Sequence, residues 1–110
     1  MNILFLLVDS FNTEKFFGNK KTSITPNLDK LIETGTFFSE AVTSAPVTLP
    51  SISSIFTSKY PFESTTLDNN LFNLNQNIPN FIDELHSNEF STYAILPEGI
   101  MHTNIPKLFH

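Results

Sequence analysis

The sequence contains no cysteine, no tryptophan and no arginine. The absence of cysteine excludes disulfides and thiolate metal sites, and it is compatible with a reducing compartment. The absence of arginine removes the guanidinium group that commonly clamps phosphate or sulfate through two parallel hydrogen bonds. A cationic side chain that holds an anion in this protein must therefore be one of the six lysines.

Basic residues and long apolar runs are also scarce. The net charge is −5, and nucleic-acid binding needs a basic face, so we expect no nucleic-acid partner. The apolar run at residues 3–8 is far too short to span a bilayer. It has neither the preceding basic residue nor the following cleavage site of a signal peptide. We therefore expect a cytoplasmic protein without a membrane segment.

What the sequence does contain is typical of one small globular domain. Its 110 residues are 40% hydrophobic and include 12 phenylalanines. A disordered chain does not carry that much aromatic area, so we expect a modest core built around phenylalanine.

The N-terminal run at residues 3–8 predicts a strand that is buried on both faces, as in a parallel sheet. Asp9 and Ser10 follow it directly. Functional side chains of open α/β sheets gather just past the carboxyl ends of strands, which makes Asp9 a candidate site residue. A carboxylate that only caps a loop or helix explains Asp9 equally well.

Residues 25–35 carry the signals of a helix. Thr25 is placed as the N-cap, Pro26 as the first helical residue and Gly35 just past the end. Residues 36–42 alternate and have β-propensity, so they predict a short strand.

A second helix is predicted to follow Pro46, because Leu49, Ile52 and Phe56 recur at helical spacing before Tyr60-Pro61 stops the pattern. Thr48 lies where the loop turns into this helix. Its hydroxyl would meet the unsatisfied N–H groups and the positive dipole end, where anions bind well. Thr48 is therefore the best candidate nucleophile, although most threonines at such positions are simply N-caps.

The rest of the chain continues the alternation of helices and strands. Residues 63–77 are rich in Asn, Thr and Ser and predict a loop. A third helix is expected around residues 78–86 with Pro79 in its first turn, followed by a strand at residues 91–96 and a tail without strong periodicity. The pattern predicts an α/β fold with a mostly parallel sheet flanked by helices. Three strands make a small sheet, so we expect residues 1–110 to be the incomplete opening of a larger α/β domain.

Four segments in this order resemble the sulfatase / alkaline phosphatase superfamily. Residues 2–10 resemble its first strand and metal-binding aspartate, and residues 25–38 resemble the helix that follows. Residues 45–61 resemble the nucleophile segment, and residues 78–94 resemble a later helix and strand. The resemblance covers residues 2–96 and implies the N-terminal portion of an alkaline-phosphatase-like catalytic domain.

The resemblance implies a metal-dependent hydrolase or transferase acting on a small anionic sulfate, phosphate or phosphonate ester. Asp9 matches the aspartate that binds a divalent metal (Ca, Mg, Mn or Zn). Ser10 stands where many members have a second aspartate, and Thr48 matches the nucleophile, which also binds the metal. Lys59 matches a basic residue that some members place near the substrate oxyanion, although a solvated lysine at a helix end is an equally good interpretation.

The nucleophile segment departs from the sulfatase pattern. Sulfatases carry a cysteine or serine there, converted to formylglycine within a Cys-x-Pro-x-Arg type motif. This sequence has Thr48 at the first position and Ile52 in place of the arginine. Threonine cannot form that aldehyde, so the chain favours phospho- or phosphonoester chemistry, in which the metal activates Thr48 for in-line attack. This assignment requires Asp9 and Thr48 to lie each about 2 Å from a shared ion.

The family completes its metal site with ligands from segments absent here. His86, His102 and His110 match no ligand motif, and one aspartate binds a divalent ion poorly. We therefore expect residues 1–110 to be inactive on their own. A non-catalytic α/β binding module, or a decayed remnant of such an enzyme, is the alternative. An incomplete sheet would also expose a strand edge and an apolar face, which favours self-association.

Overall fold

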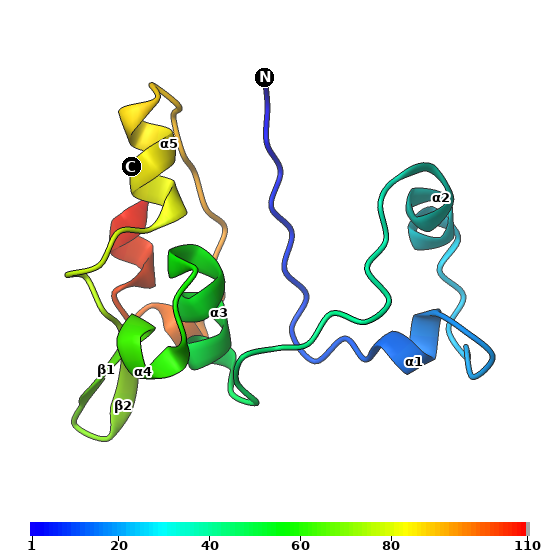
Figure 1. The fold of residues 1–110 in the computed structure, drawn as a ribbon, viewed down its shortest axis with the longest axis horizontal. Coiled ribbons are helices and arrows are strands. Elements are labelled where there is room, and N and C mark those ends of the chain that lie inside the picture. The colour runs from blue at the N-terminus through cyan, green and yellow to red at the C-terminus, as the bar shows by residue number, and fades with distance from the viewer. Residues whose placement is uncertain (110) are drawn as a thin grey trace. The chain divides into compact units, whose positions relative to one another are not determined.

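The computed structural model of the protein describes residues 1–109. They divide into two compact units, Met1–Ala41 and Val42–His110, which are traced in Figure 1. No helix within the described part of the chain combines the length and the apolar character needed to cross a membrane.

The first unit contains two helices, α1 (Thr13–Phe16) and α2 (Pro26–Thr34). The predicted boundaries of α2 are confirmed, with Thr25 as N-cap, Pro26 in the first turn and Gly35 as C-cap. Gly35 does not take the left-handed conformation, since its φ is −110°. Glycine fits here for another reason: a Cβ would lie 2.9 Å from the Leu31 carbonyl oxygen.

No residue of the first unit is buried. Four of its phenylalanines form ring pairs instead. Phe11 stacks on Phe16 with ring centroids 4.5 Å apart, and Phe17 packs against Phe37 at 4.4 Å. Each side chain of the run from Ile3 to Val8 is at least 40% exposed. The unit therefore has aromatic contacts but lacks a closed core.

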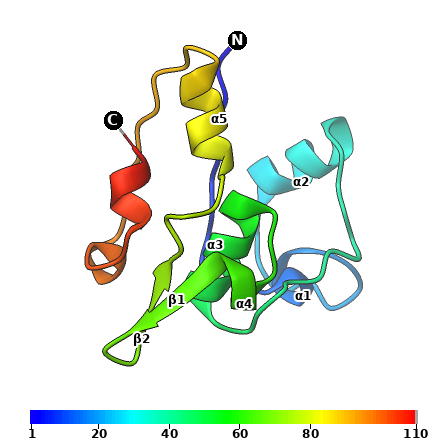
Figure 2. The same ribbon diagram turned by 60° about the vertical axis from the view of Figure 1, so that its left-hand side comes forward.

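The second unit contains helices α3 (Thr48–Thr57), α4 (Pro61–Ser64) and α5 (Phe81–Ser87), the strands β1 (Thr65–Asp68) and β2 (Leu71–Leu74), and the 3₁₀ helices η1 (Glu98–Ile100) and η2 (Ile105–Leu108). Figure 2 shows the hairpin and α4 beside α3. Six side chains from α3, β2, α5 and η2 form the core: Ile52, Phe56, Leu74, Ile82, Ile105 and Leu108.

Helix α5 begins one turn later than predicted. Asn80 is its N-cap, and the Asn80 side-chain oxygen accepts hydrogen bonds from the backbone N–H groups of Ile82 (3.1 Å) and Asp83 (3.0 Å). Pro79 therefore precedes the helix rather than lying in its first turn. The tail that lacked periodicity also contributes to the core, because Ile105 is 0% exposed.

The sheet differs from the sequence prediction. Among residues 1–109 it consists of β1 and β2, paired antiparallel with Thr65 opposite Leu74. The predicted strands at residues 3–8, 36–42 and 91–96 are not assigned as strands, and a mostly parallel sheet is not confirmed. A strand has no internal hydrogen bonds and needs a partner, so β-propensity alone does not produce one.

The predicted loop at residues 63–77 was also wrong, because it contains this hairpin. The two connecting residues, Asn69 and Asn70, have φ angles of 49° and 63°. Positive φ at both central positions is the requirement of a type I′ turn, and asparagine tolerates it better than most residues.

Candidate active site

The loop before α3 is tied to the first turn of that helix. The Thr43 hydroxyl lies 2.9 Å from the Ala45 carbonyl oxygen and 2.8 Å from the Ser51 hydroxyl, and it accepts the Ala45 N–H at 3.3 Å. Ala45 is buried. These contacts fix the backbone that leads into Thr48. The sequence pattern did not single out Thr43 or Ser51 as residues that position Thr48. The one local indication is that both carry a hydroxyl group and lie close to Thr48 in the sequence.

Thr48 is the first residue of α3 and not its N-cap. The N-cap is Val47, whose side chain makes no capping hydrogen bond. Thr48 therefore follows the N-cap of α3 by one residue. Its side chain is exposed at the positive end of a 10-residue helix. Exposure, dipole and first-turn N–H groups together make this position suitable for an anionic group.

The residue one turn further along α3 has a different environment. Ile52 is only 9% exposed and belongs to the core of the second unit. In the resemblance described above, position 52 stands where the formylglycine motif has its arginine. The arginine is thus absent from the sequence, and the structure fills its position with a packed aliphatic side chain.

Asp9 and Ser10 lie in the first unit. The Asp9 carboxylate accepts a hydrogen bond from the Ser10 N–H at 2.9 Å, and Ser10 has a φ of 57°. Both residues are exposed. Because Asp9 and Thr48 belong to different units, the expected sharing of one ion by Asp9 and Thr48 stays a prediction.

Lys59 and Thr48 lie in the same unit but at opposite ends of α3. The helix ends at Thr57, and Ser58 takes a left-handed conformation with φ 55°. Lys59 follows, exposed, with its backbone N–H bonded to the Thr57 hydroxyl at 3.3 Å. Ten helical residues rise about 15 Å along the axis, so the backbones of Lys59 and Thr48 are far apart.

The described residues do not provide a metal centre. Among residues 1–109 no group of three or more His, Cys, Asp or Glu side chains could hold a metal ion. His86 lies 2.5 Å from the Thr92 hydroxyl through its Nε2 atom, and His102 is exposed. His110 lies outside the described residues. Asp9 with the Ser10 and Thr48 hydroxyls is an insufficient ligand set for a divalent ion, which takes at least four ligands in most protein sites.

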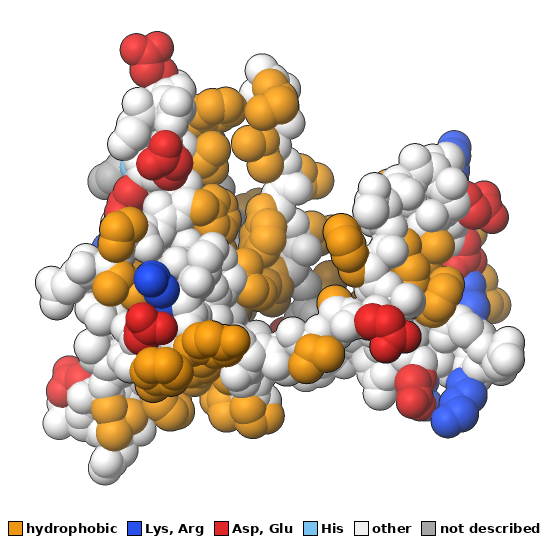
Figure 3. Space-filling model, in the orientation of Figure 1, with side chains coloured by type: hydrophobic (Ala, Val, Ile, Leu, Met, Phe, Trp, Pro, Cys, Tyr) orange, Lys and Arg blue, Asp and Glu red, His pale blue; other side chains and the backbone are white. Residues whose placement is uncertain are grey.

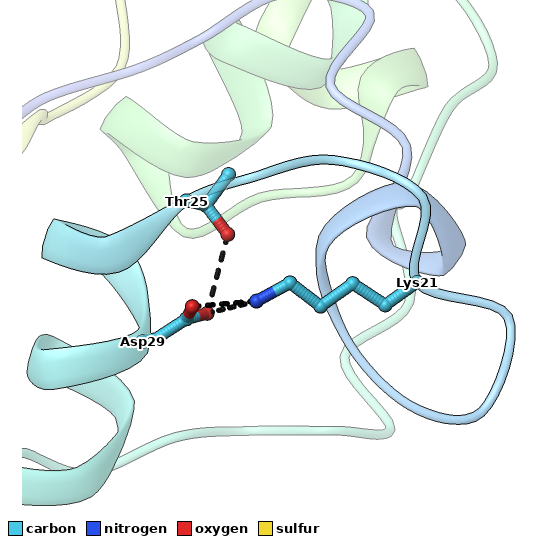
Figure 4. A network of polar contacts seen from close by, with 3 residues as sticks. All are labelled: Lys21, Thr25 and Asp29. Carbon is cyan, nitrogen blue, oxygen red and sulfur yellow. Dashed lines mark hydrogen bonds and ion pairs between the residues drawn. The ribbon is translucent and has the colours of Figure 1, made fainter.

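An ion pair lies in the first unit, at the start of α2 (Figure 4). The Lys21 ammonium is 2.5 Å from both carboxylate oxygens of Asp29, and the Thr25 hydroxyl donates to Asp29 at 3.2 Å. The hydrogen bond from Lys21 lowers the pKa of Asp29 below its usual value of 3.8. The network joins α2 to the preceding loop and is structural.

Comparison with known proteins gives one family. The model of the Sulfatase family matches residues 1–104. An ulvan-active sulfatase from Formosa agariphila is 37% identical over 65 residues, which is 57% of this chain and 13% of that protein. The chain thus spans about an eighth of the length of this relative. No solved structure matches.

Proposed function

Because the chain belongs to the sulfatase family, we propose that it forms part of a hydrolase or transferase of small anionic esters with Thr48 as the nucleophile. The observation that carries this proposal is the position of Thr48. It is exposed on the first residue of α3, after an N-cap that offers no side-chain acceptor. A hydroxyl in that position can approach an anion that the helix N-terminus attracts.

Phospho- or phosphonoesters are the proposed substrates, in preference to sulfate esters. Threonine cannot be converted to the aldehyde on which formylglycine chemistry depends. The buried Ile52 supports the same preference, because the core leaves no polar surroundings for the arginine of that motif. Sulfatase family membership and phosphoryl chemistry are compatible, since both reactions transfer a tetrahedral anionic group from oxygen.

The proposed reaction has a covalent intermediate. The Thr48 Oγ1 attacks the phosphorus in line, the Oγ1–P bond forms, and the bond from phosphorus to the leaving oxygen breaks. The hydroxyl proton ends on the leaving alcohol. Water or an acceptor alcohol then attacks the phosphothreonine and regenerates Thr48. Lys59 is a proposed contributor of positive charge to a part of the substrate distant from Thr48, because the ten residues of α3 separate the two backbones by about 15 Å, which a lysine side chain does not span.

Divalent metals serve the family generally, and we propose that Asp9, Ser10 and Thr48 each offer one oxygen to such an ion. These residues do not form a sufficient site, because residues 1–109 contain no cluster of ligating side chains. The remaining ligands would have to be supplied from elsewhere. The 110-residue chain on its own is therefore expected to be inactive.

The test uses two forms of the protein. In the first, the chain alone is assayed with 4-nitrophenyl phosphodiester, phosphonate and sulfate substrates in the presence of divalent metals. In the second, residues 1–104 replace the matching segment of the Formosa agariphila sulfatase. We expect no turnover in the first form, and in the second a faster reaction with the phosphorus esters than with the sulfate ester.

Matched substitutions identify the nucleophile in the chimera. Thr48→Ala removes the hydroxyl and should abolish turnover, whereas Thr48→Ser keeps a hydroxyl and should retain part of it. Intact-mass measurement after a rapid quench should detect the phosphoryl ester or phosphonyl group that stays on the protein after nitrophenol leaves, and Thr48→Ala should abolish this adduct. Turnover that survives Thr48→Ala, or a preference for the sulfate ester, would contradict the proposal.

The alternative function is a non-catalytic α/β binding module or a decayed remnant of the enzyme. The missing ligand cluster in the described residues favours it. A folded chimera that binds the phosphorus esters without any turnover or covalent product would support this alternative over the enzyme.

A further inference from the structure

The loop that leads into Thr48 is held by side-chain hydroxyls. Between residues 42 and 46, all of which the structure describes, no backbone N–H or carbonyl group takes part in a backbone–backbone hydrogen bond. Pro46 has no N–H group, and its neighbours Ala45 and Val47 border an open depression of about 340 Å³. Neither secondary structure nor close packing on that side fixes this loop, so its order depends on other contacts.

Ser51 anchors both ends of the loop. Its backbone N–H donates to the Val47 carbonyl oxygen at 3.1 Å, where α3 begins. Its hydroxyl lies 2.8 Å from the hydroxyl of Thr43, which is eight residues earlier in the chain. The segment from Thr43 to Ser51 is therefore closed on a single residue, and Thr48 lies within this closed segment.

The number of hydroxyl hydrogens sets the direction of the hydrogen bonds in this bridge. Thr43 has one hydroxyl hydrogen, which it donates to the Ala45 carbonyl oxygen at 2.9 Å. The Thr43 oxygen also accepts the Ala45 N–H at 3.3 Å. Ser51 must then be the donor in the contact between the two hydroxyls. Thr43 thus satisfies both backbone groups of the buried Ala45 and accepts the hydroxyl hydrogen of Ser51.

The placement of Thr48 depends on these contacts, because cationic side chains are scarce in the second unit. Lysines are sparse beside the hydrophobic and uncharged side chains on the face of the molecule shown in Figure 3. The second unit carries two of the six lysines, Lys59 and Lys107. Lys59 follows the far end of α3, and Lys107 donates to the Asn104 side chain at 2.8 Å. The alignment of Thr48 with an anion therefore depends mainly on how the backbone holds Thr48.

We propose that Thr43 is a positioning residue for the reaction at Thr48 and that it acts through its hydroxyl bridge to Ser51. This inference rests on the proposed function and adds a residue to it. In-line attack needs the Thr48 oxygen aligned with the phosphorus, and a misplacement of about 1 Å can lower a rate about 100-fold. Loss of the bridge frees the loop and lets the position of Thr48 vary, while every group that contacts the substrate remains.

The first experiment measures backbone order in the full 110-residue chain, so it does not depend on turnover. Thr43→Val keeps the branched shape of the side chain and removes the hydroxyl. Nitrogen-15 relaxation gives the order parameters of the Ala45, Val47 and Thr48 amides. We expect values of about 0.85 in the wild-type chain, typical of a rigid backbone, and a fall toward about 0.6 in Thr43→Val.

Three further variants make this measurement specific. Thr43→Ser keeps the hydroxyl and should restore the order parameters. Thr65→Val is the matched control, because it removes a hydroxyl that donates to the Pro61 carbonyl oxygen at 2.6 Å in the same unit, and it should leave the three amides unchanged. Ser51→Ala removes the bridge from the helix side with a residue that favours helix, and it should reproduce the effect of Thr43→Val. Ser51→Ala decides the result if Thr43→Val does not fold.

The second experiment measures kinetics in the chimera described above. Thr43→Val should lower kcat about 10- to 100-fold and change KM by less than about twofold, because alignment is lost and the substrate contacts remain. Thr43→Ser should recover most of kcat, and Thr65→Val should match the wild-type chimera. A general loss of structure would instead lower kcat in Thr65→Val as well.

Several results would overturn the inference. These are unchanged order parameters in Thr43→Val and Ser51→Ala, a loss of order without a fall in kcat, a change confined to KM, or a fall in kcat that Thr43→Ser does not rescue. The outcome is distinguishable from failure of the proposed function. A wild-type chimera without turnover contradicts the assignment of Thr48 as nucleophile, whereas the order parameters of the full chain still decide whether Thr43 holds the loop.

Discussion

Replacing Ile52 by arginine restores the charged position of the formylglycine motif and should unfold the second unit. Ile52 is 9% exposed and packs in one cluster with core residues that include Phe56, Leu74 and Ile82. Arginine at this position would bring an unpaired guanidinium into an apolar core that holds no acidic side chain.

The expected cost is similar to the whole stability of the unit. Forcing a longer side chain into a packed core costs about 1–3 kcal/mol, and an uncompensated buried charge costs about 3–5 kcal/mol. Domains are stable by about 0.05–0.15 kcal/mol per residue, so a unit spanning Val42–His110 has on the order of 3–10 kcal/mol. Ile52→Arg should therefore leave the second unit mostly unfolded without denaturant.

Ile55→Arg is the matched control, because it makes the same change on the same helix at a side chain that is 45% exposed. Such a surface substitution should change the free energy of unfolding by no more than about 0.5 kcal/mol. Urea unfolding followed by far-UV circular dichroism measures both variants. Equal midpoints for Ile52→Arg and Ile55→Arg would refute the reasoning.

Three further predictions concern the helix ends and the ion pair. Asn80→Ala removes the side-chain acceptor at the start of α5 and should lower the free energy of unfolding by about 1 kcal/mol, measured by urea unfolding. Gly35→Ala places a Cβ against the Leu31 carbonyl and should lower α2 helicity, measured by amide hydrogen exchange. The pKa of Asp29 is lowered by Lys21, so this pair stabilises the fold fully above pH 3.8 and its contribution is lost as the pH falls below that value. Carbon-13 NMR titration should give a midpoint for Asp29 below 3.8, and Lys21→Met should return it toward that value.

Helices α2, α3 and α5 could be predicted because their signals are local. Pro26 and Gly35 mark the ends of α2 through their own backbone properties, independent of any distant residue. The apolar spacing that includes Ile52 and Phe56 predicted α3, and both residues lie in the core. Thr48 shows the limit of such signals, since sequence alone did not separate an N-cap from the first helical residue.

The strands could not be predicted in the same way, because pairing joins distant residues. The run at residues 3–8 has the composition of a buried strand, but no strand of the described residues pairs with it. The hairpin was missed for the opposite reason. Its polar residues suggested a loop, whereas the Asn69-Asn70 pair was a local turn signal that fixed the register.

The exposed run at residues 3–8 also affects the proposed metal site at Asp9. Asp9 follows this run directly, so the position of its carboxylate depends on how the run is held. Ile3, Leu4 and Leu6 are 56%, 88% and 76% exposed, and burying such side chains contributes about 25 cal/mol per Å². A partner strand that covers the run would order the backbone of Asp9 at the same time. Self-association of the run would also order this backbone, but in a different environment. Metal affinity at Asp9 should therefore increase only under conditions that also protect the amides of residues 3–8 from hydrogen exchange.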